Sequence, residues 1–166
     1  MSNVRKEIEL YEPMVVWLKE YLEDLYKRQK CEIRVVDAHA WTLDKILEQH
    51  GVISQYPQVV GLDIEIDVLG IVIFPMHSEL FFVEAKKTAL TLRDLGQLWA
   101  YCRLCNPKDA FLLSSRSLGS LDKLINNLNR EDLLDFGSGK TIKKMKVAVW
   151  DVDRSTVNQH SLVPKL

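Results

Sequence analysis

Acidic and basic side chains stand in two neighbouring segments of the sequence where apolar strands are expected. Asp67 interrupts one apolar run, and Glu84 and Lys86, two residues apart, end the next. Because side chains alternate between the two faces of a strand, Glu84 and Lys86 share a face. The turn-forming segment 75–79 predicts an antiparallel hairpin. We therefore expect Asp67 to lie beside Glu84, with two carboxylates and an ammonium group in one pocket.

Such a pocket suits the hydrolysis of a phosphodiester. Carboxylate oxygens bind Mg²⁺, and the bound metal neutralises charge on the phosphate and lowers the pKa of its water. A nearby lysine can orient that water. The alternative is that Glu84 and Lys86 are solvated ends of a strand, which an E-x-K triplet alone would favour. Their position at the ends of apolar strands favours a functional site instead.

The spacing of apolar residues predicts the elements that position these groups. Residues 4–27 show the three-and-four spacing of an amphipathic helix, and Pro13 favours a start near Glu12, where proline is tolerated in a first turn. In the strand 62–74, alternation predicts one apolar and one acidic face, and Asp63 and Glu65 are interpreted as solvated strand edges. The other expected elements are strands at 31–38, 80–85, 110–113 and 146–152, and helices at 42–50, 91–104 and 118–128.

This order predicts an α/β fold with a mixed central sheet flanked by helices. The length of 166 residues fits a single domain over 1–166. With Gln97 and Tyr101 one turn apart in the expected helix 91–104, the chain resembles the PD-(D/E)XK nuclease superfamily, with its restriction endonuclease-like αβββαβ core, over residues 7–113. In that family the site comprises a glutamate on the first helix, an aspartate on the second strand, an E-x-K on the third and often a glutamine on the next helix. The residues at those places here are Glu12, Asp67, Glu84, Lys86 and Gln97.

The resemblance implies a role for each residue of the site. Asp67 and Glu84, with the carbonyl of Ala85, would ligate Mg²⁺ or Mn²⁺. Lys86 would position or activate the attacking water. Gln97 would hold Lys86 or touch the substrate backbone.

The acid on the first helix is open to three choices. Glu7, Glu9 and Glu12 are all available, and the helical face does not decide between them. Glu12 is preferred because it opens the better-formed part of the amphipathic pattern, and it would complete the metal or water shell. The family's proline before the aspartate is replaced by Ile66, a position where the family is lax.

The resemblance implies a metal-dependent nuclease acting on DNA, with endonucleolytic cleavage favoured. Nothing in the residues themselves separates DNA from RNA. A homodimer is expected, because one active site cuts one strand of a duplex. The rival interpretation is an inactive member of the same fold that serves as a nucleic-acid-binding or assembly subunit, and a third is a plain interaction module. The net charge of −1, from 22 basic and 23 acidic residues, suits the rivals, since nucleic-acid modules are usually basic.

A basic loop near the C-terminus is a second candidate contact for nucleic acid. Lys140, Lys143 and Lys144 could bind the phosphate backbone, although a lysine-rich loop is more often simply solvated. The same loop contains G-S-G-K-T, but Leu134 stands where a phosphate-binding P-loop needs its first glycine.

The insertion between the first strand and Asp67 contains His39, Trp41 and Tyr56. These rings could stack on bases at the edge of the site. Packing in the core is the commoner fate of tryptophan, and a single histidine is more often a surface or capping residue.

The remaining features bear on the compartment. There is neither an apolar run of about 20 residues nor the pattern of a signal peptide, so a cytoplasmic location without membrane spans is expected. An odd number of cysteines predicts reduced, packed thiols, and a C-x-x-C without a fourth cysteine does not predict a metal cluster. The cysteines are Cys31, Cys102 and Cys105.

Overall fold

The computed structural model describes residues 4–137 and 139–165. The chain begins with helix α1 (Ile8–Leu25), which carries Pro13 in its interior. The start expected near Glu12 is therefore wrong. Tertiary packing decides the start, because Leu10 and Tyr11 are already buried in the first turns.

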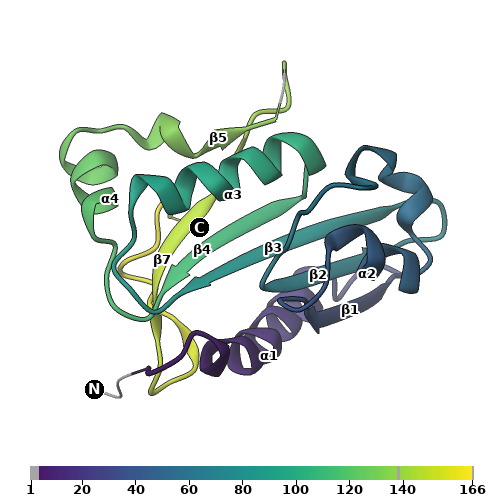
Figure 1. The fold of residues 1–166 in the computed structure, drawn as a ribbon, viewed down its shortest axis with the longest axis horizontal. Coiled ribbons are helices and arrows are strands. Elements are labelled where there is room, and N and C mark those ends of the chain that lie inside the picture. The colour runs from purple at the N-terminus through teal and green to yellow at the C-terminus, as the bar shows by residue number, and fades with distance from the viewer. Residues whose placement is uncertain (1–3, 138, 166) are drawn as a thin grey trace.

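A mixed sheet forms the centre of the described molecule (Figure 1). Its strand order is β1-β2-β3-β4-β7-β8, with β1–β2–β3 and β7–β8 antiparallel and β3–β4–β7 parallel. The strands are β1 (Glu32–Asp37), β2 (Val68–Ile73), β3 (Ser78–Lys86), β4 (Asp109–Ser114), β7 (Lys146–Asp151) and β8 (Thr156–Val157). The expected α/β class with a mixed sheet is confirmed.

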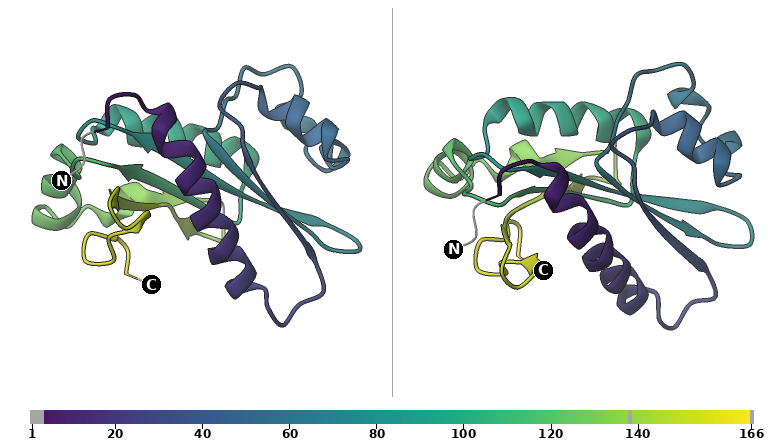
Figure 2. Two further views of the ribbon diagram at one scale, coloured as in Figure 1. Left: turned by 90° about the horizontal axis from the view of Figure 1, so that it is seen from below. Right: turned by 60° about the horizontal axis from the view of Figure 1, so that its bottom comes forward.

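Helices cover both faces of the sheet (Figures 1 and 2). α1 and the C-terminal segment pack on one face, in a core that includes Met14, Leu18 and Trp150. α3 (Leu92–Cys105) packs on the other, in a second core with the segments that precede β2 and follow β4. Those segments contain α2 (Leu43–Gln49), η1 (Ile53–Gln55), η2 (Pro57–Val59), α4 (Ser120–Asp122), the π-helical η3 (Lys123–Asn127), η4 (Glu131–Leu134), β5 (Asp135–Phe136) and β6 (Lys143–Lys144).

Strand β2 begins later in the chain than the sequence predicts. Ile66 packs in the core beside α3, whereas Val68 packs in the core beside α1, so the chain reorients between them. Before Val68 the backbone makes hydrogen bonds that are not part of the strand pairing. The Leu43 N–H donates to the Ile64 carbonyl, and the Ala38 N–H donates to the Asp67 carbonyl. The expected strand 62–74 is thus shortened, and Asp67 stands where the chain joins the sheet.

The β2–β3 hairpin forms as predicted and closes with a hydrogen bond from the Phe74 N–H to the His77 carbonyl. Its register pairs Val68 with Val83, which sets Asp67 opposite Glu84. α1 crosses closely over this hairpin: a Cβ at Gly70 would lie 2.9 Å from Leu22 Cδ1. The register and the close crossing together fix the place of the carboxylates against α1.

The thiols agree with expectation. Cys31, Cys102 and Cys105 are free, and the last two are buried. Burial raises the pKa of both buried thiols, that of Cys105 to about 12, so they remain protonated packing groups. Within the described residues, no helix combines the length and apolar character needed to span a membrane.

Candidate active site

Asp67 and Glu84 lie side by side at the start of β2 and near the end of β3. The Asp67 N–H donates to Glu84 Oε1 at 3.1 Å, and the Ala85 N–H donates to Asp67 Oδ2 at 2.8 Å. Each carboxylate is therefore held by the backbone of the opposite strand. The expected juxtaposition of these residues is present.

The pair is buried at an electrostatic cost. Glu84 is only 8% exposed, and burial, followed by the nearby charge of Asp67, raises its pKa well above the ordinary value of 4.5. Burial also raises the pKa of Asp67. Burial and mutual repulsion oppose the ionisation of the two adjacent carboxyl groups, and a bound cation would stabilise their ionised forms.

The donor set fits Mg²⁺ or Mn²⁺. Mg²⁺ is commonly bound by one or two carboxylates, with water and substrate phosphate completing the shell. Asp67 and Glu84 supply the carboxylates, and among the described residues no third His, Cys, Asp or Glu side chain joins them to form a metal-binding group. The remaining ligands would then be water, substrate oxygens and a main-chain carbonyl such as that of Ala85.

Lys86 projects from the same strand toward α3. Its side chain is 23% exposed, and its Nζ lies 4.0 Å from Asp94 Oδ1. Its charge lowers the pKa of both Asp67 and Glu84, opposing the effect of burial. Lys86 therefore lies with the carboxylates, as predicted, and Asp94 is a partner that the sequence analysis missed.

Asp94 owes its place to the start of α3. Thr91 and Asp94 form a capping box, in which the Thr91 hydroxyl accepts from the Asp94 N–H and the Asp94 side chain accepts from the Thr91 N–H. The T-x-x-D spacing in the sequence was the signal that could have revealed it. Gln97, one turn later, is exposed, and its Nε2 donates to the Tyr101 hydroxyl at 3.3 Å. The expectation that Gln97 holds Lys86 is not met.

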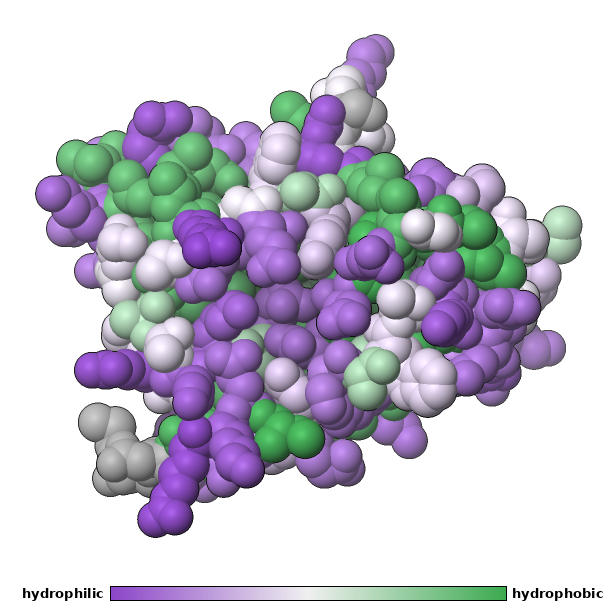
Figure 3. Space-filling view, in the orientation of Figure 1, coloured by the Kyte–Doolittle hydropathy of each residue, from purple (hydrophilic) through white to green (hydrophobic). Residues whose placement is uncertain are grey.

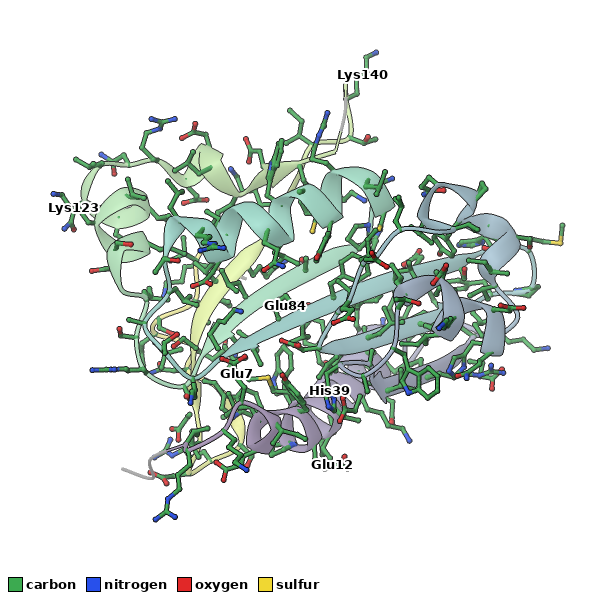
Figure 4. All side chains as sticks on the ribbon, viewed as in Figure 1. Glu7, Glu12, His39, Glu84, Lys123 and Lys140 are labelled. Carbon is green, nitrogen blue, oxygen red and sulfur yellow. The ribbon has the colours of Figure 1, made fainter. Side chains whose placement is uncertain are left out.

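The acid on α1 that approaches the site is Glu7 rather than Glu12. Glu7 precedes the helix, accepts a hydrogen bond from the Lys87 N–H at 3.4 Å, and raises the pKa of Asp67 through its charge. Glu12 is exposed and points away from the sheet (Figure 4). The preference for Glu12 depended on a helix that starts there, and the true start at Ile8 turns its side chain outward.

Tyr11 links α1 to the carboxylate pair. Its side chain is buried close to Asp67, whose charge acts on the phenol. Burial, followed by the charge of Asp67, raises the pKa of the phenol, which keeps it a neutral donor. His39 lies against it, with ring centroids 4.7 Å apart, and His39 Nδ1 pairs with the carboxylate of Asp37. Tyr11 falls within the amphipathic pattern of residues 4–27, which gives no sign of its place beside Asp67.

The other rings of the insertion differ in environment. Tyr56 is buried, and its hydroxyl lies 2.9 Å from Ser78 Oγ, so it packs in the core. Trp41 is exposed. Stacking on bases stays a prediction for Trp41 alone.

The C-terminal lysines are mostly engaged inside the protein. Lys143 Nζ donates to the Pro107 carbonyl at 2.7 Å, and Lys144 pairs with Asp135. Lys140 is exposed at the tip of its loop, well away from Glu84 (Figure 4). Ser138, in the same loop, lies outside the described residues. The expected basic cluster is therefore reduced to Lys140.

The surface around the site is hydrophilic. In Figure 3 polar side chains cover the middle of this face, and apolar side chains gather above it on either side. One of the apolar areas is a groove of about 340 Å³ along α3, lined in part by Leu92, Leu95 and Trp99. The surface on this face is therefore polar, while Glu84 itself is buried beneath it.

Comparisons with protein-family models, with curated proteins and with solved structures found no match. The geometry of the site is therefore the basis for a functional proposal.

Proposed function

We propose that this protein is a metal-dependent nuclease that hydrolyses phosphodiester bonds, with DNA as substrate and endonucleolytic cleavage favoured. The observation that carries the proposal is the buried Asp67–Glu84 pair, braced across two strands with Lys86 beside it. Buried carboxylates are costly, and this cost is expected where a cation and a phosphate are to be bound.

The arrangement of elements supports a PD-(D/E)XK-like fold. α1, the strands β1 to β3, α3 and β4 follow one another along the chain, with α2 inserted between β1 and β2. This is the αβββαβ order that the resemblance implies. The carboxylates lie on its second and third strands.

Each residue has a role in the proposed reaction. Asp67 and Glu84, with the Ala85 carbonyl, would hold Mg²⁺ or Mn²⁺. The bound metal would neutralise phosphate charge and lower the pKa of its water. Lys86, which pairs with Asp94, would orient that water, and Tyr11 lies buried close to Asp67.

An inactive binding or assembly subunit is the rival function. The net charge of −1 favours it. The raised pKa of Glu84 counts against it, because a scaffold gains nothing from an ionisable group that opposes folding at neutral pH.

Incubation with supercoiled, linear and branched DNA tests the function. We expect cleavage with Mg²⁺ or Mn²⁺ and none with EDTA. Asp67→Asn and Glu84→Gln should each lower the rate by roughly a hundredfold or more, since each removes a negatively charged ligand of the metal that would neutralise the phosphate. Asp63→Asn is the matched control, because Asp63 is an exposed acid of the same segment. Undiminished cleavage in both site variants would refute the site, and an inactive wild type would favour the rival.

We further propose that the protein acts on duplexes as a homodimer. Each site cuts one strand, and a standard interface needs only about 800 Å² per partner, against a total accessible surface of 9414 Å². Light scattering that finds a monomer under conditions of double-strand cleavage would contradict this.

A further inference from the structure

We propose that His39 is a catalytic residue of this site, the general acid that protonates the oxygen leaving the phosphorus. The inference rests on the nuclease function proposed above and assigns the leaving-group side of that reaction. Three features support it: the place of His39 in the sheet order, the groups that hold its ring, and its partial exposure.

The sheet order places His39 and Lys86 on opposite flanks of the carboxylates. His39 follows β1, Asp67 immediately precedes β2, and Lys86 ends β3 on the side of α3. The Ala38 N–H donates to the Asp67 carbonyl at 2.9 Å, which ties the His39 loop to the start of β2.

The ring of His39 is held in one orientation. The Asp37 carboxylate accepts from the backbone N–H of His39 at 3.2 Å and also pairs with Nδ1. A carboxylate that accepts a hydrogen bond from Nδ1 leaves Nε2 for the substrate. Tyr11 packs against the ring at 4.7 Å, with an angle of 35° between the ring planes.

His39 is also connected to the carboxylates while remaining accessible. The ring packs on Tyr11, and the Ala38 N–H beside it donates to the Asp67 carbonyl, so the ring is positioned relative to the proposed metal ligands. The His39 side chain is 33% exposed. A histidine buried purely for packing would not retain this access.

The chemistry requires an acid on this flank. As the water oxygen bonds to phosphorus, the bond to the leaving oxygen breaks and its electron pair moves onto that oxygen. The attacking and leaving oxygens lie roughly in line on opposite sides of phosphorus. With Lys86 on the water side, His39 gives the proton on Nε2 to the leaving oxygen. The water proton passes to solvent, which returns a proton to His39.

The test compares two leaving atoms in otherwise identical duplexes. One duplex has natural phosphodiesters, and the other carries sulfur in place of the leaving oxygen at the mapped cleavage position. A thiol has a pKa of about 8.5, whereas an alkoxide is nearly as basic as hydroxide. Sulfur therefore leaves without protonation. Loss of a general acid should slow only the natural duplex.

His39→Gln should lower single-turnover cleavage of the natural duplex by roughly 10²–10⁴-fold and of the sulfur duplex by only a few-fold. Asp37→Asn should show the same selectivity with a smaller loss, since its amide oxygen can still accept the His39 N–H. His77→Gln is the matched control, because His77 lies in the distant hairpin turn and is 59% exposed. Duplex binding in Ca²⁺, followed by fluorescence anisotropy, should be unchanged in all three variants.

Two results would overturn the inference while leaving the nuclease function intact. One is natural cleavage by His39→Gln at the wild-type rate. The other is an equal loss on both duplexes, which would assign His39 a structural or binding role. A wild type that cleaves neither duplex would refute the proposed function, and the role of His39 with it.

Discussion

At the scale of single residues, the site consists of charges that the fold holds at a cost. Glu84 is almost fully buried beside Asp67, and both have raised pKa values. Backbone N–H groups from the opposite strands and the charge of Lys86 recover part of that cost. Because these groups interact, the effect of substituting one of them depends on which of its neighbours are present.

Lys86 and Lys87 give a direct test, because neighbours on a strand point to opposite faces. Lys86 lies with the carboxylates and Asp94, whereas Lys87 Nζ donates to the Arg5 carbonyl. Lys86→Ala should slow single-turnover cleavage by roughly a hundredfold or more without loss of Mn²⁺ binding. Lys87→Ala should cleave nearly normally. Equal rates in the two variants, or loss of Mn²⁺ binding in Lys86→Ala, would mean that the role of Lys86 is different.

Glu7 and Glu12 form a second matched pair on α1. Of the two, Glu7 raises the pKa of Asp67 through its charge, whereas Glu12 is exposed on the outer side of the helix. We expect Glu7→Gln to weaken Mn²⁺ binding, measured by calorimetry, by about 1 kcal/mol or less, because one charge is lost near a partly exposed site. Glu12→Gln should bind as the wild type does. A larger loss of Mn²⁺ binding in Glu12→Gln than in Glu7→Gln would show that Glu12 is the acid that acts on the site, as the sequence predicted.

At the scale of elements, the start of α3 positions Lys86. The capping box of Thr91 and Asp94 fixes the first turn of the helix, and the same Asp94 carboxylate meets Lys86. Asp94 therefore both stabilises the start of α3 and contacts Lys86 of the site.

Thr91→Ala should therefore lower the free energy of unfolding by about 1 kcal/mol, because an orphaned N–H of α3 loses its acceptor. Thr42→Ala is the control at α2, where the threonine side chain makes no capping bond to the backbone. Urea unfolding measures both. An equal or larger loss for Thr42→Ala would show that the capping bond is not what stabilises α3.

At the scale of the whole molecule, the site predicts how stability depends on pH. The folded state favours protonated Glu84, so between the ordinary pKa of 4.5 and the raised value it binds more protons than the unfolded chain. Stability contributed by this group is present below pH 4.5 and is lost as pH rises through the folded pKa. The metal-free protein should therefore unfold at lower temperature as pH rises above about 4.5 through the raised pKa of Glu84.

Glu84→Gln should flatten that decline, and Mg²⁺ or Mn²⁺ should oppose it in the wild type by binding the ionised pair. Glu20→Gln, a change at an exposed position of α1, should leave the slope unaltered. Calorimetry across the pH range measures the unfolding temperature of each variant. Identical slopes for the wild type and Glu84→Gln would show that this carboxyl does not govern the stability of the molecule.

The sequence by itself determined the features that depend on local pattern. Period-two alternation and a short turn predicted the β2–β3 hairpin, and the hairpin places Asp67 opposite Glu84. The α/β class, the bounds of most elements to within two residues and the packing of Cys102 and Cys105 followed from the same kind of reasoning.

Only the tertiary structure decided how separate elements meet. The start of α1 depends on burial of Leu10 and Tyr11 against the sheet, which overrides the local effect of Pro13 and exchanges Glu12 for Glu7. The contact of Asp94 with Lys86 and the packing of His39 on Tyr11 join residues of different elements. Spacing reports which side chains share a face of one element, whereas contacts between elements depend on helix ends, crossing distances and packing that no single segment encodes.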